Sequence, residues 1–141
     1  MHELLKDYTV SVEIPVAREE MDAMGLINNV NYFRYFQSAI VAYVEKIGYL
    51  DHLEKTDEGI VVGSTDCQFK MPVVYPDTLH IGSRVVDVED DRFVLEFCLV
   101  SEQHNKVAAK GTGVIVAYDR KHQQKMLIPK PLREKILELK A

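Results

Sequence analysis

The longest periodic pattern in the chain lies in the stretch 22–50, where it follows a turn and predicts one amphipathic helix. At about 100° per residue, one half of this helix is apolar and strongly aromatic. That half carries Tyr32, Phe33, Phe36, Ala39, Ile40, Tyr43, Val44 and Ile47, and the opposite half carries Asn31, Arg34, Ser38 and Glu45. An apolar arc this wide requires a partner that curves around the helix.

Polar residues and glycines on either side of the pattern indicate where the helix begins and ends. Asparagine is a preferred N-cap residue, so Asn28 is expected to cap the first turn, and Asn29 could do the same. Gly25 can supply a turn with positive φ ahead of them. Gly48 is the expected C′ residue, since Lys46 lies near the negative end of the helix dipole. The polar run 51–59 predicts a connection.

Five segments alternate between apolar and polar residues as β-strands do. The first covers residues 8–16, and Pro15 indicates that it ends or lies at a sheet edge. The other four follow the helix with short turns at a spacing of about ten residues, which favours an antiparallel meander over βαβ crossovers. They cover residues 60–71, 78–88, 92–101 and 107–119, and residues 131–140 form a short amphipathic helix.

Composition supports a single domain over residues 1–141. The chain has 141 residues and 47% hydrophobic content, which is enough to bury a core without disulfides or metal. Cys67 and Cys98 both lie in strand patterns and are expected to be buried thiols in a reducing compartment. The first eight residues lack an apolar signal region and no apolar run approaches about 20 residues, so we expect a soluble cytoplasmic protein. A net charge of −5 argues against a broad basic surface for nucleic acid.

These patterns predict an α+β fold in which one curved, antiparallel, five-stranded sheet wraps around the central helix. The order of elements and three sequence motifs also resemble the hotdog-fold acyl-CoA thioesterases of the hydroxybenzoyl-CoA thioesterase type. The motifs are DxxG…NNxxY…YF over residues 22–36, YPDTLHIG over residues 75–82, and AKGTGVIVAYDRKHQQKMLIP over residues 109–129. The resemblance covers nearly the whole chain.

The resemblance implies the position of the active site. In that family the aspartate of the DxxG loop is the nucleophile or the general base, which maps to Asp22 here. A backbone N–H at the start of the helix polarises the thioester carbonyl, which maps to Asn29 or its neighbours, including Gly25. Asn28 would contact substrate if it is not simply the cap, and Tyr32 and Phe36 would line the acyl pocket if they are not simply core.

Family members form homodimers whose sheets join edge to edge, often paired again into homotetramers, with active sites between protomers. The resemblance therefore implies a homodimer, and a homotetramer of two such dimers. An acidic chain that binds the phosphates of coenzyme A also needs local cations. Candidates at strand ends and turns are Lys70, Arg84, Lys106, Lys110, Arg120 and Lys121, although a surface charge pair is the more ordinary role of each. The prediction rests on the last four.

Thioester hydrolysis requires only the aspartate and the helix N-terminus named above. Attack on a thioester builds negative charge on oxygen, which a helix N-terminus can stabilise with free N–H groups and its dipole. Coenzyme A thiolate is a good leaving group, so the reaction needs no metal or separate cofactor, and coenzyme A is part of the substrate. The five histidines do not form a metal-binding pattern.

Other interpretations remain open at this point. Asp22 could be only a turn or cap residue, in which case the protein would bind acyl-CoA without catalysis. A hotdog hydratase or dehydratase would use an Asp/His pair, but the nearest histidine after Asp22 is His52, beyond the helix. Many relatives have a histidine where this chain has Leu26. The subgroup of the Tol-Pal system carries Tyr-His where this chain has Asn28 and Asn29, which argues against that assignment.

Overall fold

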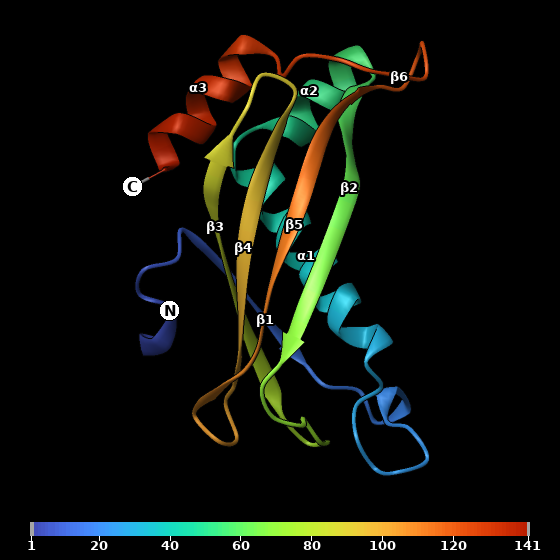
Figure 1. Ribbon diagram of the computed structural model, residues 1–141, viewed down its shortest axis with the longest axis vertical. Coiled ribbons are helices and arrows are strands. Elements are labelled where there is room, and N and C mark those ends of the chain that lie inside the picture. Colours follow the sequence, from blue (N-terminus) through green and yellow to red (C-terminus); the bar gives the residue numbers. More distant parts are fainter. Residues whose placement is uncertain (1, 141) are drawn as a thin grey trace.

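A computed structural model describes residues 2–140 as one curved antiparallel sheet with a long helix packed against one of its faces (Figure 1). The strands are β1 (Val10–Pro15), β2 (Glu58–Phe69), β3 (Thr78–Val88), β4 (Arg92–Ser101), β5 (Lys106–Asp119) and the two-residue β6 (Gln124–Lys125). The helices are α1 (Val30–Lys46), α2 (Tyr49–Thr56) and α3 (Lys130–Leu139), with 3₁₀ turns at η1 (Glu3–Leu5) and η2 (Arg18–Glu20). The expected α+β architecture of five main strands, a long central helix and a short C-terminal helix is confirmed.

The order of the strands corrects one prediction. Strands β3, β4 and β5 form the predicted meander, but β2 pairs with β5, so the sheet order is β1-β3-β4-β5-β2. The segment 70–77 carries the chain away from β2, and β3 then pairs with β1. Alternation shows which face of a strand is buried but not which strand lies beside it, so the sequence pattern could not exclude the simpler meander.

The predicted connection over residues 51–59 is wrong, because most of it belongs to α2. Gly48 adopts a left-handed conformation with φ of 92°, which ends α1 as predicted and lets a second helix begin at Tyr49. That helix is held by burial of Tyr49 and by Leu53, which packs over Gly59 of β2. The segment is short and mostly polar, so its few apolar residues do not give a recognisable helical pattern in the sequence.

The buried face of α1 is rotated slightly from the predicted one. Phe33, which was predicted to face the core, is 39% exposed. Tyr35 and Asn31 are buried instead, and Asn31 Nδ2 donates a hydrogen bond to the Glu20 carbonyl oxygen at 3.2 Å. The η2 turn reaches back to cover this side of the helix, and a helical projection contains no information about that segment.

Phe36 occupies the centre of the core. Its ring stacks on Phe97 of β4 with centroids 4.7 Å apart. A Cβ atom on Gly111 of β5 would lie 2.6 Å from Phe36 Cε2, so only glycine allows the ring to approach the sheet this closely. Phe36 is therefore a core residue.

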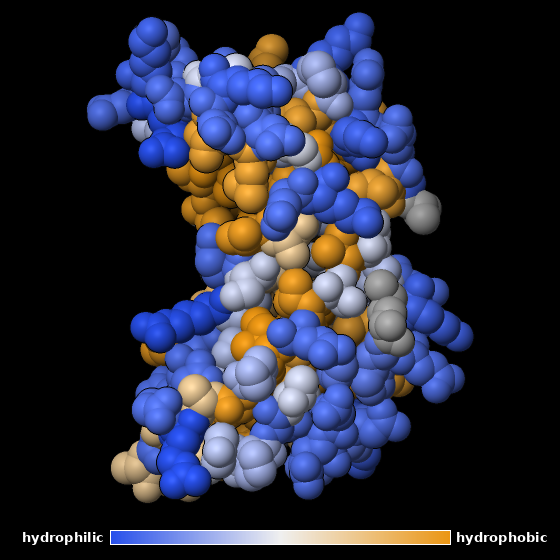
Figure 2. All heavy atoms as spheres, turned by 180° about the vertical axis from the view of Figure 1, so that it is seen from behind, coloured by the Kyte–Doolittle hydropathy of each residue, from blue (hydrophilic) through white to orange (hydrophobic). Residues whose placement is uncertain are grey.

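Two strands form the edges of the sheet, β1 on one side and β2 on the other. The edge position predicted from Pro15 is confirmed for β1. On the β2 side, Val61, Val62 and Phe69 are each more than a third exposed. Figure 2 shows apolar side chains gathered on the helix side of the molecule near this edge.

Both cysteines are free thiols, with Cys98 buried and Cys67 half-buried. Burial raises the pKa of Cys67 to about 11, and the neighbouring Asp66 adds to the effect. Within residues 2–140, no helix combines the length and the apolar character needed to cross a bilayer.

Candidate active site

The loop that carries Asp22 is closed by its own backbone. The Asp22 N–H donates to the Leu26 carbonyl oxygen at 2.7 Å, and the Gly25 N–H donates to the Asp22 carbonyl oxygen at 3.1 Å. Gly25 has φ of 78°, so this turn requires the left-handed conformation that glycine adopts without strain. Met21 and Ile27 form a β-bridge that brings the two ends of the loop together.

The carboxylate of Asp22 is held by one of its two oxygens. Oδ1 accepts hydrogen bonds from the N–H groups of Met24 at 2.8 Å and Leu26 at 3.2 Å. Within the described part of the chain, Oδ2 has no hydrogen-bond partner, and the residue is only partly buried. The carboxylate is therefore fixed in direction, and one oxygen remains available.

The N–H groups in the first turn of α1 donate hydrogen bonds to two asparagines, Asn28 and Asn29. Asn28 Oδ1 accepts from the Val30 N–H at 3.1 Å, so its side chain caps the helix as predicted, although the N-cap position itself is Asn29. The side chain of Asn29 makes no capping bond. Asn29 is an exposed residue and its N–H has no partner among residues 2–140, whereas the Gly25 N–H is used in its own turn. Of the predicted donors, Asn29 is thus the one with a free N–H.

A cavity of about 300 Å³ opens at this end of the helix. Tyr32 forms one wall, and its ring meets Phe69 of β2 edge to face with centroids 4.9 Å apart. Burial raises the pKa of Tyr32, so its hydroxyl stays protonated. The full lining consists of Leu26, Ile27, Asn29, Tyr32, Phe69, Lys70, Met71 and Pro72. Lys70 was among the predicted cations, but the sequence analysis missed the contribution of Phe69, Met71 and Pro72, because alternation in a strand does not indicate that its end meets a helix N-terminus.

The four predicted cations do not lie together in one protomer. Lys106 and Lys110 are on the half of β5 that pairs with the end of β2. Arg120 and Lys121 follow the other end of β5. Figure 1 shows that the loop before α1 lies at the same end of the molecule as the β4–β5 turn, whereas α2 and β6 lie at the opposite end.

Two further cavities flank α1. One of about 690 Å³ lies beside the β1 side of the helix start and includes Glu19 and Glu20, whose carboxylates would repel the phosphates of a coenzyme A ester. The other, of about 430 Å³, lies between α1, α2 and β2 and has Arg120 in its lining.

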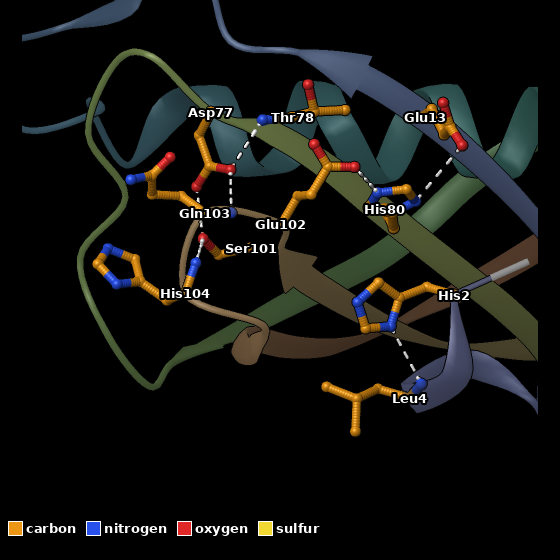
Figure 3. A network of polar contacts seen from close by, with 10 residues as sticks. All are labelled: His2, Leu4, Glu13, Asp77, Thr78, His80, Ser101, Glu102, Gln103 and His104. Carbon is orange, nitrogen blue, oxygen red and sulfur yellow. Dashed lines mark hydrogen bonds and ion pairs between the residues drawn. The ribbon is translucent and has the colours of Figure 1, made fainter.

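A separate polar network joins the turns at the ends of β3 and β4 (Figure 3). Ser101 Oγ donates to Asp77 Oδ2, while Asp77 Oδ1 accepts from the N–H groups of Thr78 and Gln103. Ser101 is fully buried, and His104 contacts its Oγ only through a backbone N–H at 3.3 Å. Within residues 2–140 no imidazole nitrogen bonds to Ser101, so this network is a structural tie and not a nucleophile.

His80 lies near that tie on the outer face of the sheet. Its Nε2 is 2.9 Å from Glu102 Oε1 and its Nδ1 is 3.7 Å from Glu13 Oε1. This arrangement links β1, β3 and the end of β4. It involves none of the residues that surround Asp22.

Comparison with known proteins identifies the superfamily of the chain. The model of the thioesterase-like superfamily matches residues 16–136. This chain belongs to that superfamily. It is 22% identical to the long-chain acyl-CoA thioesterase of Escherichia coli (strain K12), over 92% of this chain and 98% of that protein. It is 23% identical to a chloroplastic acyl-acyl carrier protein thioesterase of Arabidopsis thaliana, over 89% of this chain but only 66% of that protein.

Solved structures give the same result for the fold. A crystal structure of a Pseudomonas aeruginosa (strain PAO1) protein aligns with a TM-score of 0.85 at 26% identity, covering 97% of this chain and 95% of that one. The resemblance to the hotdog-fold thioesterases is therefore confirmed. The chain spans about two thirds of the Arabidopsis relative, which contains sequence with no counterpart here.

Proposed function

We propose that this protein hydrolyses acyl-CoA thioesters to the free acid and coenzyme A, with Asp22 and the N-terminus of α1 as its catalytic groups. One observation carries the proposal. The Asp22 carboxylate is anchored by Oδ1 and keeps Oδ2 free, in a loop that leads directly to the unpaired N–H of Asn29. Membership of the thioesterase-like superfamily supports the same reaction.

In this mechanism the thioester carbonyl oxygen accepts a hydrogen bond from the Asn29 N–H. The positive end of the α1 dipole stabilises the negative charge that develops there. Asp22 Oδ2 then either attacks the carbonyl carbon or removes a proton from a water that attacks it. If water attacks, its C–O bond replaces the C–S bond, and the thiolate leaves with the electron pair and takes up the proton that Asp22 removed from the water. If Asp22 attacks, the thiolate leaves and is protonated by solvent, and water then cleaves the C–O bond of the acyl-aspartyl anhydride, which releases the acid and restores the Asp22 carboxylate.

The aromatic wall at the helix start fits the substrate side of this mechanism. Tyr32 and Phe69 line the cavity beside Asn29 with apolar ring surface, which suits the acyl group next to the reacting carbonyl. Asn28 acts through the helix it caps, holding the first turn in the geometry that presents the Asn29 N–H.

The proposed assembly is a homodimer joined through the β2 edges, with the active sites between protomers, and a homotetramer of two dimers. An exposed strand edge with apolar side chains is a site for pairing, and β2 has both features. We expect the protein in the cytoplasm, where coenzyme A esters occur and the free thiols of Cys67 and Cys98 would stay reduced.

The geometry argues against a hydratase. His52, the first histidine after Asp22, lies on α2 beyond the far end of α1, and its Nε2 bonds to Glu58 Oε1 at 2.7 Å. It therefore cannot form an Asp/His pair with Asp22 in the same protomer.

The test is release of free thiol from a panel of coenzyme A esters, from butyryl to palmitoyl and with benzoyl included. Hydration of crotonyl-CoA is measured in parallel. We expect thiol release without hydration. Binding of the esters with no thiol release would favour a non-catalytic acyl-CoA-binding protein. Faster turnover of acyl carrier protein thioesters than of coenzyme A esters would indicate that the substrate carries its acyl group on acyl carrier protein.

A further inference from the structure

Among the described residues, α1 buries a single amide side chain, that of Asn31. Asn31 is 7% exposed and lies in the first turn of the helix. A buried amide loses its hydrogen bonds to water and therefore needs a partner in the protein. Asn31 does not line the cavity beside Asn29, and it has no role in the mechanism described above.

The partner of Asn31 is the carbonyl oxygen of Glu20, the last residue of η2. That oxygen accepts hydrogen bonds from Asn31 Nδ2 at 3.2 Å and from the Asn28 N–H at 3.0 Å. These two hydrogen bonds are here named the Glu20 clamp. Asn28 is itself fixed to the helix, because its Oδ1 accepts from the Val30 N–H. The start of α1 thus holds one carbonyl group of η2 from two positions.

The side chain of Glu20 also lies against the helix. Its Oε1 accepts from the Ala17 N–H at 2.7 Å, which closes the η2 turn. Burial, reinforced by the charge of Glu20, raises the pKa of Tyr35, which lies one turn further along α1 than Asn31. The η2 turn is therefore a rigid support for the clamp.

The Asp22 loop closes on itself, so its internal hydrogen bonds do not determine how it is oriented relative to the helix. The Met21–Ile27 bridge joins its two ends, and Asp22 Oδ1 accepts from N–H groups of the same loop. Figure 1 shows the loop projecting below the start of α1, and Met24 within it is 81% exposed. A closed, exposed loop of this kind can turn as a unit about its two ends. The contacts at those ends therefore determine where Asp22 Oδ2 lies.

The two ends of the loop are held in different ways. At the exit, the Ile27 N–H donates to the Val73 carbonyl oxygen at 2.9 Å, which ties the loop to the segment 70–77. At the entrance, the Glu20 clamp lies two residues before Asp22. Its amide donor, Asn31, lies two residues after Asn29 in the helix that presents the free N–H. The clamp therefore couples the position of the carboxylate to that of the oxyanion donor.

We propose that Asn31 is a positioning residue for thioester hydrolysis, which acts through the Glu20 clamp to hold the Asp22 carboxylate at the carbonyl bound by Asn29. The inference rests on the proposed function and adds a residue that does not touch the substrate. Reactions between bound groups depend steeply on geometry, and a displacement of about 1 Å can cost about 10² in rate. An apolar side chain of similar size would cover η2 as well, but it would fix no direction for the Glu20 carbonyl group.

The first test is Asn31→Leu, which keeps the size of the side chain and a residue that favours helices but removes the amide donor. We expect kcat for thiol release to fall by about 10-fold to 10²-fold with KM changed by less than about twofold, because substrate contacts remain. Asn31→Ala should show the same separation of kcat from KM, and it replaces Asn31→Leu if thermal unfolding shows that the leucine variant does not fold.

Ser101→Ala is the matched control. It removes another buried hydrogen-bond donor, which bonds to Asp77 in the tie between the ends of β3 and β4. It should lower the melting temperature and leave kcat and KM at their wild-type values. If the wild-type protein releases no thiol from any ester, the proposed function fails. If it does so but kcat of the Asn31 variant stays within about twofold, or only KM rises, the function stands and the positioning role is overturned.

The second test asks whether Asn31 acts through Asp22. Asn31→Leu is combined with Asp22→Asn, and the residual thiol release is measured at high enzyme concentration. If Asn31 serves only to position the carboxylate, it should change the residual rate of Asp22→Asn by less than about twofold. Losses that multiply would show that Asn31 acts independently of Asp22, which would overturn the assignment.

Discussion

Asp22 and Leu26 hold each other through two hydrogen bonds. The Asp22 N–H donates to the Leu26 carbonyl oxygen at 2.7 Å, and the Leu26 N–H donates to Asp22 Oδ1 at 3.2 Å. The pair makes Asp22 both a turn residue and an oriented carboxylate, so the structural and the catalytic interpretations of this residue are compatible. The substitution Asp22→Asn can separate the two interpretations, because an asparagine Oδ1 can accept hydrogen bonds from the same two N–H groups.

Asp22→Asn is therefore expected to fold, assemble and bind acyl-CoA while losing catalysis. Loss of a general base or nucleophile costs about 10² to 10⁴ in rate, and kcat should fall by at least about 10². Thiol release under saturating substrate measures this, and thermal unfolding checks the fold. Asp77→Asn is the control, because Asp77 Oδ1 likewise accepts two backbone N–H groups, from Thr78 at 2.8 Å and Gln103 at 2.9 Å, and Asp77 does not lie on the β2 edge. Near wild-type kcat in Asp22→Asn would return Asp22 to a purely structural role.

The cations should act on binding rather than on chemistry. We predict that at least one of the alanine variants of Lys106, Lys110, Arg120 and Lys121 raises KM for coenzyme A esters with kcat nearly unchanged. Lys135→Ala is the control, since Lys135 lies on α3 and its Nζ is 3.8 Å from Glu138. Unchanged KM in all four variants would move the coenzyme path to another surface.

The dimer is expected to depend on the β2 edge. Light scattering should report a particle of at least twice the 16.1 kDa chain mass at micromolar concentration. Val62→Glu places a charge on the exposed apolar edge and should shift the protein toward monomer, with loss of activity. Val86→Glu, at a similarly exposed position on β3, should not. A stable wild-type monomer would contradict the shared site.

Gly111 should tolerate no side chain. A Cβ atom there would lie 2.6 Å from Phe36 Cε2 and closer still to the Asp66 carbonyl oxygen, which belongs to a paired strand and cannot move aside. Overpacking of this kind costs about 1–3 kcal/mol, and Gly111→Ala should lower the free energy of unfolding in urea by at least that range. Gly63→Ala is the comparison, because its nearest contact would be a valine methyl at 3.1 Å that can adjust. Equal losses in the two variants would argue against the close approach of Phe36.

Cys67 should react as a thiol of raised pKa. Burial and the charge of Asp66 raise its pKa to about 11 from the ordinary value of 9.0, because the thiolate is disfavoured in the folded protein. The rate of alkylation by iodoacetamide should keep rising with pH toward about 11, whereas the urea-unfolded chain should level off near 9. The stability that the protonated thiol contributes is present below the unfolded-state pKa and is lost as pH rises through 11. A plateau near pH 9 in the folded protein would exclude the shift.

The sequence by itself determined the main elements and singled out the Asp22 loop as the candidate site. The aromatic arc of α1 required a curved partner, and the alternating segments supplied it, because both patterns follow from the repeat of a regular backbone. Asp22, Gly25 and Asn28 could be singled out because turns and caps are formed by residues close together in the chain. The bounds of β3 and β4 were predicted to the residue for the same reason.

Tertiary structure decided whatever depends on contacts between distant residues. The pairing of β2 with β5, the burial of Tyr35 and Asn31 under η2, and the helix α2 held by Leu53 against Gly59 all arise from such contacts. So do the choice of the Asn29 N–H over that of Gly25 and the wall that Phe69 builds beside Tyr32. Local pattern determines which face of an element is apolar, but only the folded chain determines what covers that face and which polar groups stay free.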